Sequence, residues 1–480
     1  MTLSRMVKSL AAAVLVAASV AAPVRAQTAA ERAVEAAKKY AGTEISVVWE
    51  AGLQSLDPLN FSGPRWEKLT GIKIKVIEVP TAEMFTKILQ EHRAGTGAYD
   101  ALNVVPSWMP DLVRVGALEQ LDAYVDKYGF RDELQKIAPT YRDNQMKVDG
   151  KIYGFPDDGD VFVLYYRKDL FEDPKNREEF KAKYGYDLEA PKTWKQYDDI
   201  GKFLTDKYAP KIYGAGQFRQ PAYSQLLFQE RFRVEGGKFF DPKTMKATVN
   251  SDIGVKVFDD MRAENKFMPP GVETWGFVEA LTAFLNGDIA MTISWPPFGR
   301  FAAGYLAGEK ALSWVPTSKI VDKVGYALPP GGRPELALGF SLSVSSKSKN
   351  KEAAYLFIQW LNSEDVSTER VQLPYTLRDP FRESHYTNAA YMARWADAPK
   401  YLKTLRAGAD TGLLDLSILQ VDKYEEALRQ AMTRLWAGEP SKKILDDVAA
   451  QWDELTEKIG VDKQRAAYLD WAGKPDAYPK

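Results

Sequence analysis

The chain has 480 residues, of which 45% are hydrophobic and 27% charged. This is the composition of a globular protein, and we expect more than one lobe because a single core seldom exceeds roughly 250–300 residues. The net charge of −1 offers no general attraction to nucleic acid or to an anionic membrane. The absence of cysteine excludes disulfides and thiolate chemistry, and with only two histidines a site of three histidine ligands is excluded as well.

The first 26 residues are typical of a secretory signal peptide. Arg5 and Lys8 flank an apolar run over 10–22, and Val24-Arg25-Ala26 supplies the small residues of a cleavage site. The run is shorter than the roughly 20 residues that span a bilayer, and a buried N-terminal helix is the alternative. Since no cysteine follows the cleavage site, we expect a free protein in the periplasm and not a lipoprotein.

The region from residue 29 to 105 alternates between helix and strand patterns. The predicted elements are a surface helix over 29–41 that Gly42 stops, a strand over 45–49, a helix ending over 64–70, a strand over 72–77, a helix over 83–93 and a strand over 100–105. Strands that alternate with helices across short breaks predict a parallel sheet with helices on both faces.

A second region of the same kind is predicted over 153–316. It contains strands over 161–166 and 289–293, a helix that begins at 191–194, and helices near 253–264 and 276–286. A strand over 336–344 and a helix over 351–362 follow. The stretch 415–460 is mostly helical, with one break at Gly438-Glu439-Pro440.

Two such regions predict a cleft between two sheets. In open α/β sheets, ligands bind beyond the carboxyl ends of the strands. We therefore expect binding residues directly after the predicted strands, within 50–57, 106–108 and 294–298, and also within 157–160, just before the strand over 161–166.

Several segments occur in the order and spacing of a known family. The most specific is Gly150-Lys151-Ile152-Tyr153-Gly154-Phe155-Pro156, followed by Leu164-Tyr165-Tyr166-Arg167-Lys168-Asp169-Leu170-Phe171 and then by Pro191-Lys192-Thr193-Trp194. Further matching stretches lie at 66–74, 97–102, 116–122, 284–291 and 437–441. On these segments the chain resembles the extracellular solute-binding proteins of ABC importers, in the sugar-binding branch that includes maltose-binding proteins.

The resemblance implies a fold like that of type II periplasmic binding proteins, with two α/β lobes, a hinge, an interlobe cleft and a helical C-terminal region. After the signal peptide over 1–26, we expect an N-terminal lobe of residues 43–156 plus about 318–370 and a C-terminal lobe of residues 157–317 plus about 371–480.

The same resemblance implies a receptor and not an enzyme. We expect it to capture a monosaccharide, oligosaccharide, polyol or glycoside, to deliver it to inner-membrane ABC permease subunits, and to work as a monomer without cofactor, metal or nucleic acid. A secreted glycoside hydrolase is the alternative, because paired carboxylates beside aromatic platforms also suit that chemistry. Against a hydrolase stand the order of the matching segments and the lack of an assignable carboxylate opposite Asp160.

Sugars present flat apolar faces edged by hydroxyls, so their sites combine aromatic platforms with carboxylates, amides or arginines. Asp157, Asp158 and Asp160 form the most suggestive cluster, and Asp160 falls where the resemblance implies a ligand-contacting carboxylate. Alternatively, these aspartates cap turns or lie in solvent. A calcium loop is not indicated, since the spacing lacks its ligand pattern and its distal glutamate.

Tryptophans supply the candidate platforms. Trp295 follows the 289–293 strand, near a stacking position that the resemblance implies, and Trp275 precedes a helix. Ser107 and Trp108 follow the third strand, where the family sets a polar contact, although Trp108 could equally pack against Met109. Most aromatic side chains of the chain must belong to the core.

The remaining candidates for ligand contact lie in three loops: Glu50, Gln54 and Ser55 after the first strand, Gly339 and Phe340 after a glycine-rich turn, and Arg378 and Arg382 in a segment that resembles one facing the family's cleft. An arginine there could donate paired hydrogen bonds to vicinal hydroxyls or to an acidic sugar. Each arginine could equally pair with Asp379 or Glu383 on the surface.

Overall fold

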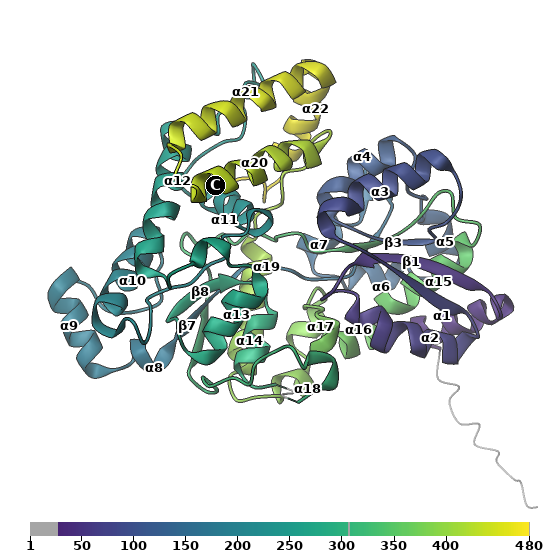
Figure 1. The fold of residues 1–480 in the computed structure, drawn as a ribbon. Helices are drawn as coiled ribbons and strands as arrows, with labels where there is room; N and C mark the ends of the chain where they lie inside the picture. Colours follow the sequence, from purple (N-terminus) through teal and green to yellow (C-terminus); the bar gives the residue numbers. More distant parts are fainter. Residues whose placement is uncertain (1–26, 306–307, 480) are drawn as a thin grey trace, which may run out of the picture.

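The computed structural model describes residues 27–305 and 308–479, so the predicted signal peptide over 1–26 lies outside the described residues. Two α/β lobes are present, each built on its own sheet (Figure 1). A short hairpin of β4 (Lys147–Val148) and β5 (Lys151–Ile152) forms a separate two-stranded sheet. The two-lobed α/β architecture implied by the resemblance is confirmed.

The first sheet has the strand order β2-β1-β3-β10-β6. The central strand β1 (Glu44–Glu50) pairs in parallel with β2 (Lys73–Val79) and with β3 (Ala101–Val104), as the alternating pattern predicts. The strands β10 (Ser341–Val344) and β6 (Phe155–Pro156) extend the sheet in antiparallel pairing. The β1 and β3 strands are largely buried because helices cover both faces of the sheet, which explains their nearly continuous apolar sequences.

Helices lie on both sides of this sheet. In Figure 1, α3 (Thr81–Ala94) and α4 (Met109–Arg114) lie on one side, and α1 (Ala29–Ala37), α2 (Gly63–Thr70) and α15 (Lys351–Asn362) lie on the other. The α1 helix begins at a capping box in which Thr28 accepts a hydrogen bond from the Glu31 amide. Its alanine face is buried and packs against α15, so the helix predicted on the surface is exposed on one side only.

The second sheet, β8-β7-β9, is antiparallel, so the prediction of a second parallel region is wrong. The β7 strand (Val163–Arg167) lies between β8 (Met291–Ser294) and β9 (Val324–Ala327). Backbone pairing joins β9 to β7, so residues 324–327 belong to the second sheet. The chain rejoins the first sheet at β10.

The strand predicted over 336–344 is also shorter than expected. Ala337 and Leu338 adopt left-handed backbone angles, with φ of 32° and 76°, which are incompatible with an extended strand. Regular pairing therefore begins only at Ser341.

Three of the other helices, which begin at residues 194, 252 and 277, lie where the sequence predicts them. The α10 helix begins at an N-cap, Thr193, whose hydroxyl accepts from the Gln196 amide, as expected for the 191–194 start. The remaining helices are α5 (Asp122–Lys127), α6 (Arg131–Gln135), α7 (Pro139–Asn144), α8 (Lys168–Phe171), α9 (Pro174–Tyr184), α10 (Trp194–Tyr208), α11 (Pro221–Val234), α12 (Asp252–Glu264), α13 (Phe277–Asn286), α14 (Pro297–Ala302), α16 (Glu364–Arg370), α17 (Glu383–Tyr386), α18 (Ala389–Met392) and α19 (Ala398–Thr411).

The C-terminal region is helical, with α20 (Val421–Trp436), α21 (Ser441–Ile459) and α22 (Val461–Ala472). The α20 and α21 helices pack on α11 and α12 of the second lobe (Figure 1), and the break between them falls at the predicted Gly438-Glu439-Pro440. Buried Arg233 of α11 pairs with Glu335 and donates to the carbonyl oxygens of Leu414 (2.7 Å) and Ala477 (2.9 Å), which anchors this region.

Three stretches of chain run between the lobes: 157–162, 328–340 and the segment between α16 and α19. The first and third touch at Gly159, where an added Cβ would lie 2.0 Å from the Pro380 carbonyl oxygen, so no larger residue fits there. Within the described ranges, the model contains no helix with the length and apolar character of a membrane span.

A buried histidine gives the fold a pH dependence. The Nδ1 atom of His385 accepts from the Phe381 amide (3.3 Å) and Nε2 lies 3.1 Å from Ser367 Oγ. Burial, together with Arg382 and Arg370, holds the pKa of His385 well below its usual 6.5. The imidazole is therefore neutral in the folded protein, whereas the unfolded chain takes up a proton below pH 6.5.

We expect the free energy of unfolding to decrease as the pH falls below 6.5, by at most about 1.4 kcal/mol per pH unit from this group. Urea titrations between pH 7.5 and 5 measure the slope. The slope should be shallower in His385→Gln, and equal slopes in the two proteins would contradict the assignment.

Candidate ligand-binding site

A cavity of about 110 Å³ lies where the two lobes meet. Its lining comes from the loop after β1, from the three stretches that cross between the lobes and from helices of the second lobe: Glu50, Ala51, Leu53, Gln54, Asp160, Tyr223, Phe277, Trp295, Pro297, Leu338, Phe340 and Leu377. Loops that follow strand ends meet here, so the cavity occupies the position at which open α/β sheets bind ligands.

One wall of the cavity is aromatic. The ring of Trp295 lies 5.5 Å from that of Tyr223 and 6.2 Å from that of Phe277, measured between ring centroids. Behind it, Phe162 (5.0 Å) and Phe218 (5.2 Å) support the indole. These contacts hold Trp295 in one orientation, as a fixed platform for a ligand.

A strained turn completes that wall. Residues 337–339 adopt left-handed backbone angles, and the Ala337 carbonyl oxygen accepts a hydrogen bond from Trp295 Nε1 (3.1 Å). Gly339 has a φ of 27°, a backbone conformation that favours glycine, and an added Cβ would lie 2.7 Å from Gln145 Nε2. Such strain persists only where the surroundings hold it, and it accumulates at functional sites. Here it places Leu338 and Phe340 on the cavity surface.

Behind the cavity lies a buried group of charges that we call the cleft cluster, composed of Asp57, Asp157, Asp158, Asp160, Asp379, Arg300, Arg370 and Arg378. Arg370 pairs with Asp57 (Nε–Oδ2, 3.0 Å) and with Asp157 (Nη1–Oδ1, 2.8 Å). Arg378 pairs with Asp157 (Nε–Oδ2, 2.9 Å) and with Asp158 (Nη1–Oδ2, 3.3 Å). These pairs join the loop after β1 to two of the crossing stretches.

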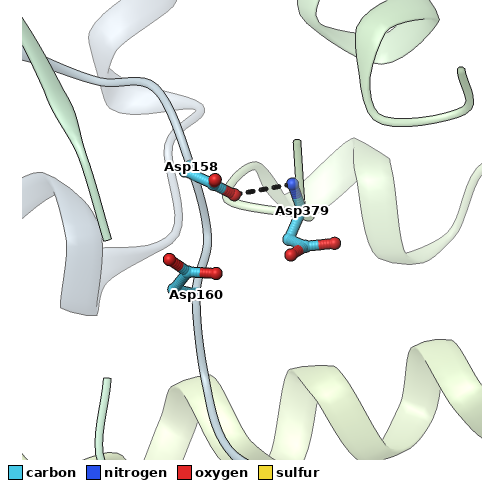
Figure 2. Close-up of side chains that lie close together, drawn as sticks. All are labelled: Asp158, Asp160 and Asp379. Carbon is cyan, nitrogen blue, oxygen red and sulfur yellow. Dashed lines mark hydrogen bonds between the residues drawn. The ribbon is translucent and has the colours of Figure 1, made fainter. Parts of the chain in front are cut away.

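Three aspartates of the cleft cluster approach one another closely (Figure 2). Asp158 Oδ1 accepts from the Asp379 amide (2.8 Å), and oxygens of Asp158, Asp160 and Asp379 all lie within 4.8 Å of one another. This spacing would suit a shared cation, but two of the three already have cationic partners: Arg378 for Asp158, and Arg300 Nη2 (2.8 Å) for Asp379. Asp160 forms no ion pair with any residue that the structure describes.

The carboxyl groups that line the cavity are Glu50 and Asp160. Burial, followed by the neighbouring carboxyl groups of Asp158 and Asp379, raises the pKa of Asp160 well above its usual range. Burial also raises the pKa of Glu50, which accepts a hydrogen bond from the Thr81 hydroxyl. Both carboxyl groups are therefore costly to ionise in the empty cavity.

Residues 35–367, which make up well over half of the chain, match the sequence profile of the bacterial extracellular solute-binding proteins. The chain belongs to this family. A probable ABC transporter-binding protein of Deinococcus radiodurans is 30% identical over 67% of this chain and 73% of its own length. The erythritol/L-threitol-binding protein of Mycolicibacterium smegmatis is 24% identical over 73% of this chain and 72% of its own length.

Among solved structures, an ABC transporter solute-binding protein of Agrobacterium radiobacter in complex with ribitol superposes with a TM-score of 0.72. It is 22% identical to this solute-binding protein, and the match covers 86% of this chain and 99% of the other. This agreement concerns the fold, and the two-lobed form implied by the sequence is common to both.

Nine of the fourteen predicted site residues of this solute-binding protein lie at the cavity or directly behind it. Five line the cavity: Glu50, Gln54, Asp160, Trp295 and Phe340. Asp157, Asp158 and Arg378 lie in the cleft cluster behind it, and Gly339 forms the strained turn. The expected surface pairing of Arg378 with Asp379 is not observed, because buried aspartates of the crossing stretches surround its guanidinium instead.

The other predicted residues do not line this cavity. Ser55 donates to Gly52 O and to Glu78, which shapes its own loop. Trp108 packs edge-on against Phe85, and half-buried Trp275 lies against Gly216. Arg382 is buried elsewhere and donates to the carbonyl oxygens of Glu133 (2.7 Å) and Asn362. Ser107 lines a separate cavity of about 50 Å³.

Sequence reasoning missed Tyr223, Phe277 and Leu377. Tyr223 lies in the first turn of α11 and Phe277 begins α13, neither of which follows a predicted strand. Leu377 lies in a left-handed conformation, with φ of 50°, one residue before Arg378. The aromatic residues carry no local signal that separates them from the core.

Removing Arg370 tests whether the cleft cluster holds the lobes together. Arg370→Ala leaves buried Asp57 and Asp157 without their main partner, so we expect a loss of about 3–5 kcal/mol in the free energy of unfolding. The control is Arg65→Ala, whose guanidinium is 40% exposed and pairs with Glu369, and which should cost at most about 1 kcal/mol. Similar losses in both variants, measured by urea titration, would refute the role of the cluster.

Proposed function

We propose that this solute-binding protein is the periplasmic receptor of an ABC importer for a small carbohydrate or polyol. The observation that supports this best is the interlobe cavity, where a fixed tryptophan platform faces two carboxyl groups. Aromatic faces with a few convergent polar groups are the lining that sugars require. The named relatives that bind erythritol, threitol or ribitol favour the same class.

The size of the cavity favours a small solute. Pockets for drug-sized ligands measure roughly 300–1,000 Å³, whereas this cavity is about 110 Å³. A monosaccharide or a short polyol fits this limit better than a long oligosaccharide. Binding would draw the lobes together about the three crossing stretches, and the closed form would be presented to the permease.

The division of the chain into two lobes follows the sheet to which each strand belongs. In this proposal the first lobe comprises the chain up to residue 156 and the return from β10 to α16, and the second lobe comprises the rest. The receptor works as a monomer, without enzymatic activity, cofactor or metal, and reaches the periplasm through its signal peptide over 1–26. The glycoside hydrolase alternative finds no support among the relatives.

A thermal-shift screen against sugars, polyols, sugar acids and glycosides tests the proposal directly. A hundredfold excess of a ligand over its dissociation constant stabilises the folded state by about 2.7 kcal/mol, which raises the unfolding midpoint. We expect a clear shift with a small carbohydrate that is recovered unaltered. A shift accompanied by hydrolysis of the compound, or none across the panel, would overturn the assignment.

Two substitutions test the map of the site. Trp295→Ala removes the platform and Asp160→Ala removes a carboxyl group, so each should weaken binding of the identified ligand by roughly 1.5–3 kcal/mol in titration calorimetry. Trp275→Ala is the matched control, because Trp275 does not line the cavity. Unchanged affinity in both site variants would refute the map.

A further inference from the structure

We propose that the solute of this receptor carries a positive charge, and that its protonated amine binds between Asp160 and Glu50. Only the carbohydrate frame of the solute rests on the proposed function. The charge follows from the groups around the cavity.

The first observation is a charge imbalance in the cleft cluster. Five aspartates share three arginines, and all eight side chains are buried. Arg370 and Arg378 are occupied by Asp57, Asp157 and Asp158. Arg300 pairs with Asp379 and donates to the carbonyl oxygens of Val371 (3.2 Å) and Arg378 (2.9 Å). The fifth aspartate, Asp160, is hydrogen-bonded to Asp379 and forms no ion pair with any of the described residues.

The second observation is that Asp160, the aspartate without an arginine partner, faces the cavity. Asp160 is 5% exposed, and it lines the cavity together with Glu50. Glu50 likewise forms no ion pair within the described part of the chain, and it accepts a hydrogen bond from the Thr81 hydroxyl. The lining contains no lysine, arginine or histidine. A cation placed here gains from both carboxylates in a site where water screens little.

The third observation is that the cavity lining holds a buried acceptor without a donor. Gln54 donates its Nε2 to Asp158 (3.3 Å), which leaves Gln54 Oε1 buried without a donor. Trp295 Nε1 already donates to Ala337. An ammonium group offers three donors and no acceptor, so it complements two carboxylates and an amide oxygen. A hydroxyl group offers one donor and brings oxygen lone pairs that need donors themselves.

The fourth observation is the aromatic wall. Tyr223, Phe277, Trp295 and Phe340 present their side chains to the same small cavity. A cation within about 6 Å of an aromatic face gains roughly 0.5–2 kcal/mol, more when it is desolvated. The carboxylates and the aromatic faces therefore favour the same kind of group.

This arrangement also corrects the expectation that a cleft arginine would admit an acidic sugar. The guanidinium of Arg378 is fully buried among aspartates and does not reach the cavity lining. An acid group in the cavity would meet Asp160 and Glu50 and no cation of the lining, so the proposal predicts that acidic solutes bind weakly.

Matched sets of compounds test the inference by titration calorimetry at pH 7. One set shares a linear frame (glucitol, N-methylglucamine and gluconate) and a second shares a ring (glucose, glucosamine and glucuronate). Putrescine, a diamine, and choline, a quaternary ammonium ion, serve as cations without a sugar frame. We expect the tightest binder to be an amine, about tenfold or more tighter than its neutral counterpart, because a charge-assisted hydrogen bond replaces a neutral one.

The inference is overturned if a neutral or acidic compound binds most tightly, or if no amine binds. A neutral sugar or polyol as the tightest binder would retain the proposed function and remove the charge. Putrescine or choline as the tightest binder would retain the charge and remove the carbohydrate frame.

Variants assign the preference to the two carboxyl groups. Asp160→Asn should abolish most of the preference for the amine over its neutral counterpart. Glu50→Gln should also reduce this preference, and it provides the test if Asp160→Asn folds poorly. The control Asp143→Asn alters an exposed carboxylate that pairs with Arg142, and it should keep the full preference. An undiminished preference in both site variants would overturn the assignment to Asp160 and Glu50.

Discussion

The architecture depends on the buried pairing of three arginines with aspartates at the junction of the lobes. Charges removed from water are stable only when partners surround them, so the segments that carry them must meet in one arrangement. Arg370 and Arg378 bring together the loop after β1, the stretch that leaves β6 and the segment after α16. The two sheets are held in their relative position by this cluster and by the close contact at Gly159.

The pairing with arginines also separates structural from binding aspartates within residues 157–160. Asp157 and Asp158 point to the arginines, whereas Asp160 lines the cavity. Gly159 between them fits tightly against Pro380, which fixes the direction of both neighbours. The binding surface is therefore built on backbone that the ion pairs support, and the strained turn at 337–339 lies beside it, because the Phe340 carbonyl oxygen accepts from the Asp157 amide. Such support holds the side chains of a site near their binding geometry.

Much of the fold could be predicted from local pattern, because β1, α3, α12, α15 and α20 have strong periodicity and clear ends. The antiparallel strand direction in the second sheet could not be predicted, because strand orientation is decided by pairing partners far apart in the chain. The roles of Asp157 and Asp160 could not be separated either, because they depend on where residues some 210 positions later lie. Tyr223 and Phe277 look like core residues in sequence, and only tertiary structure places them at the cavity.

Two asparagine variants test the division between structural and binding carboxylates most directly. Asp157→Asn weakens contacts to two buried arginines, so its free energy of unfolding should fall by at least about 2 kcal/mol while the affinity for the ligand changes little. Asp160→Asn removes a buried carboxyl group that forms no ion pair with the described residues, so its stability should be kept or increased while the affinity falls. The reverse pattern, with affinity lost in Asp157→Asn and stability lost in Asp160→Asn, would contradict the account.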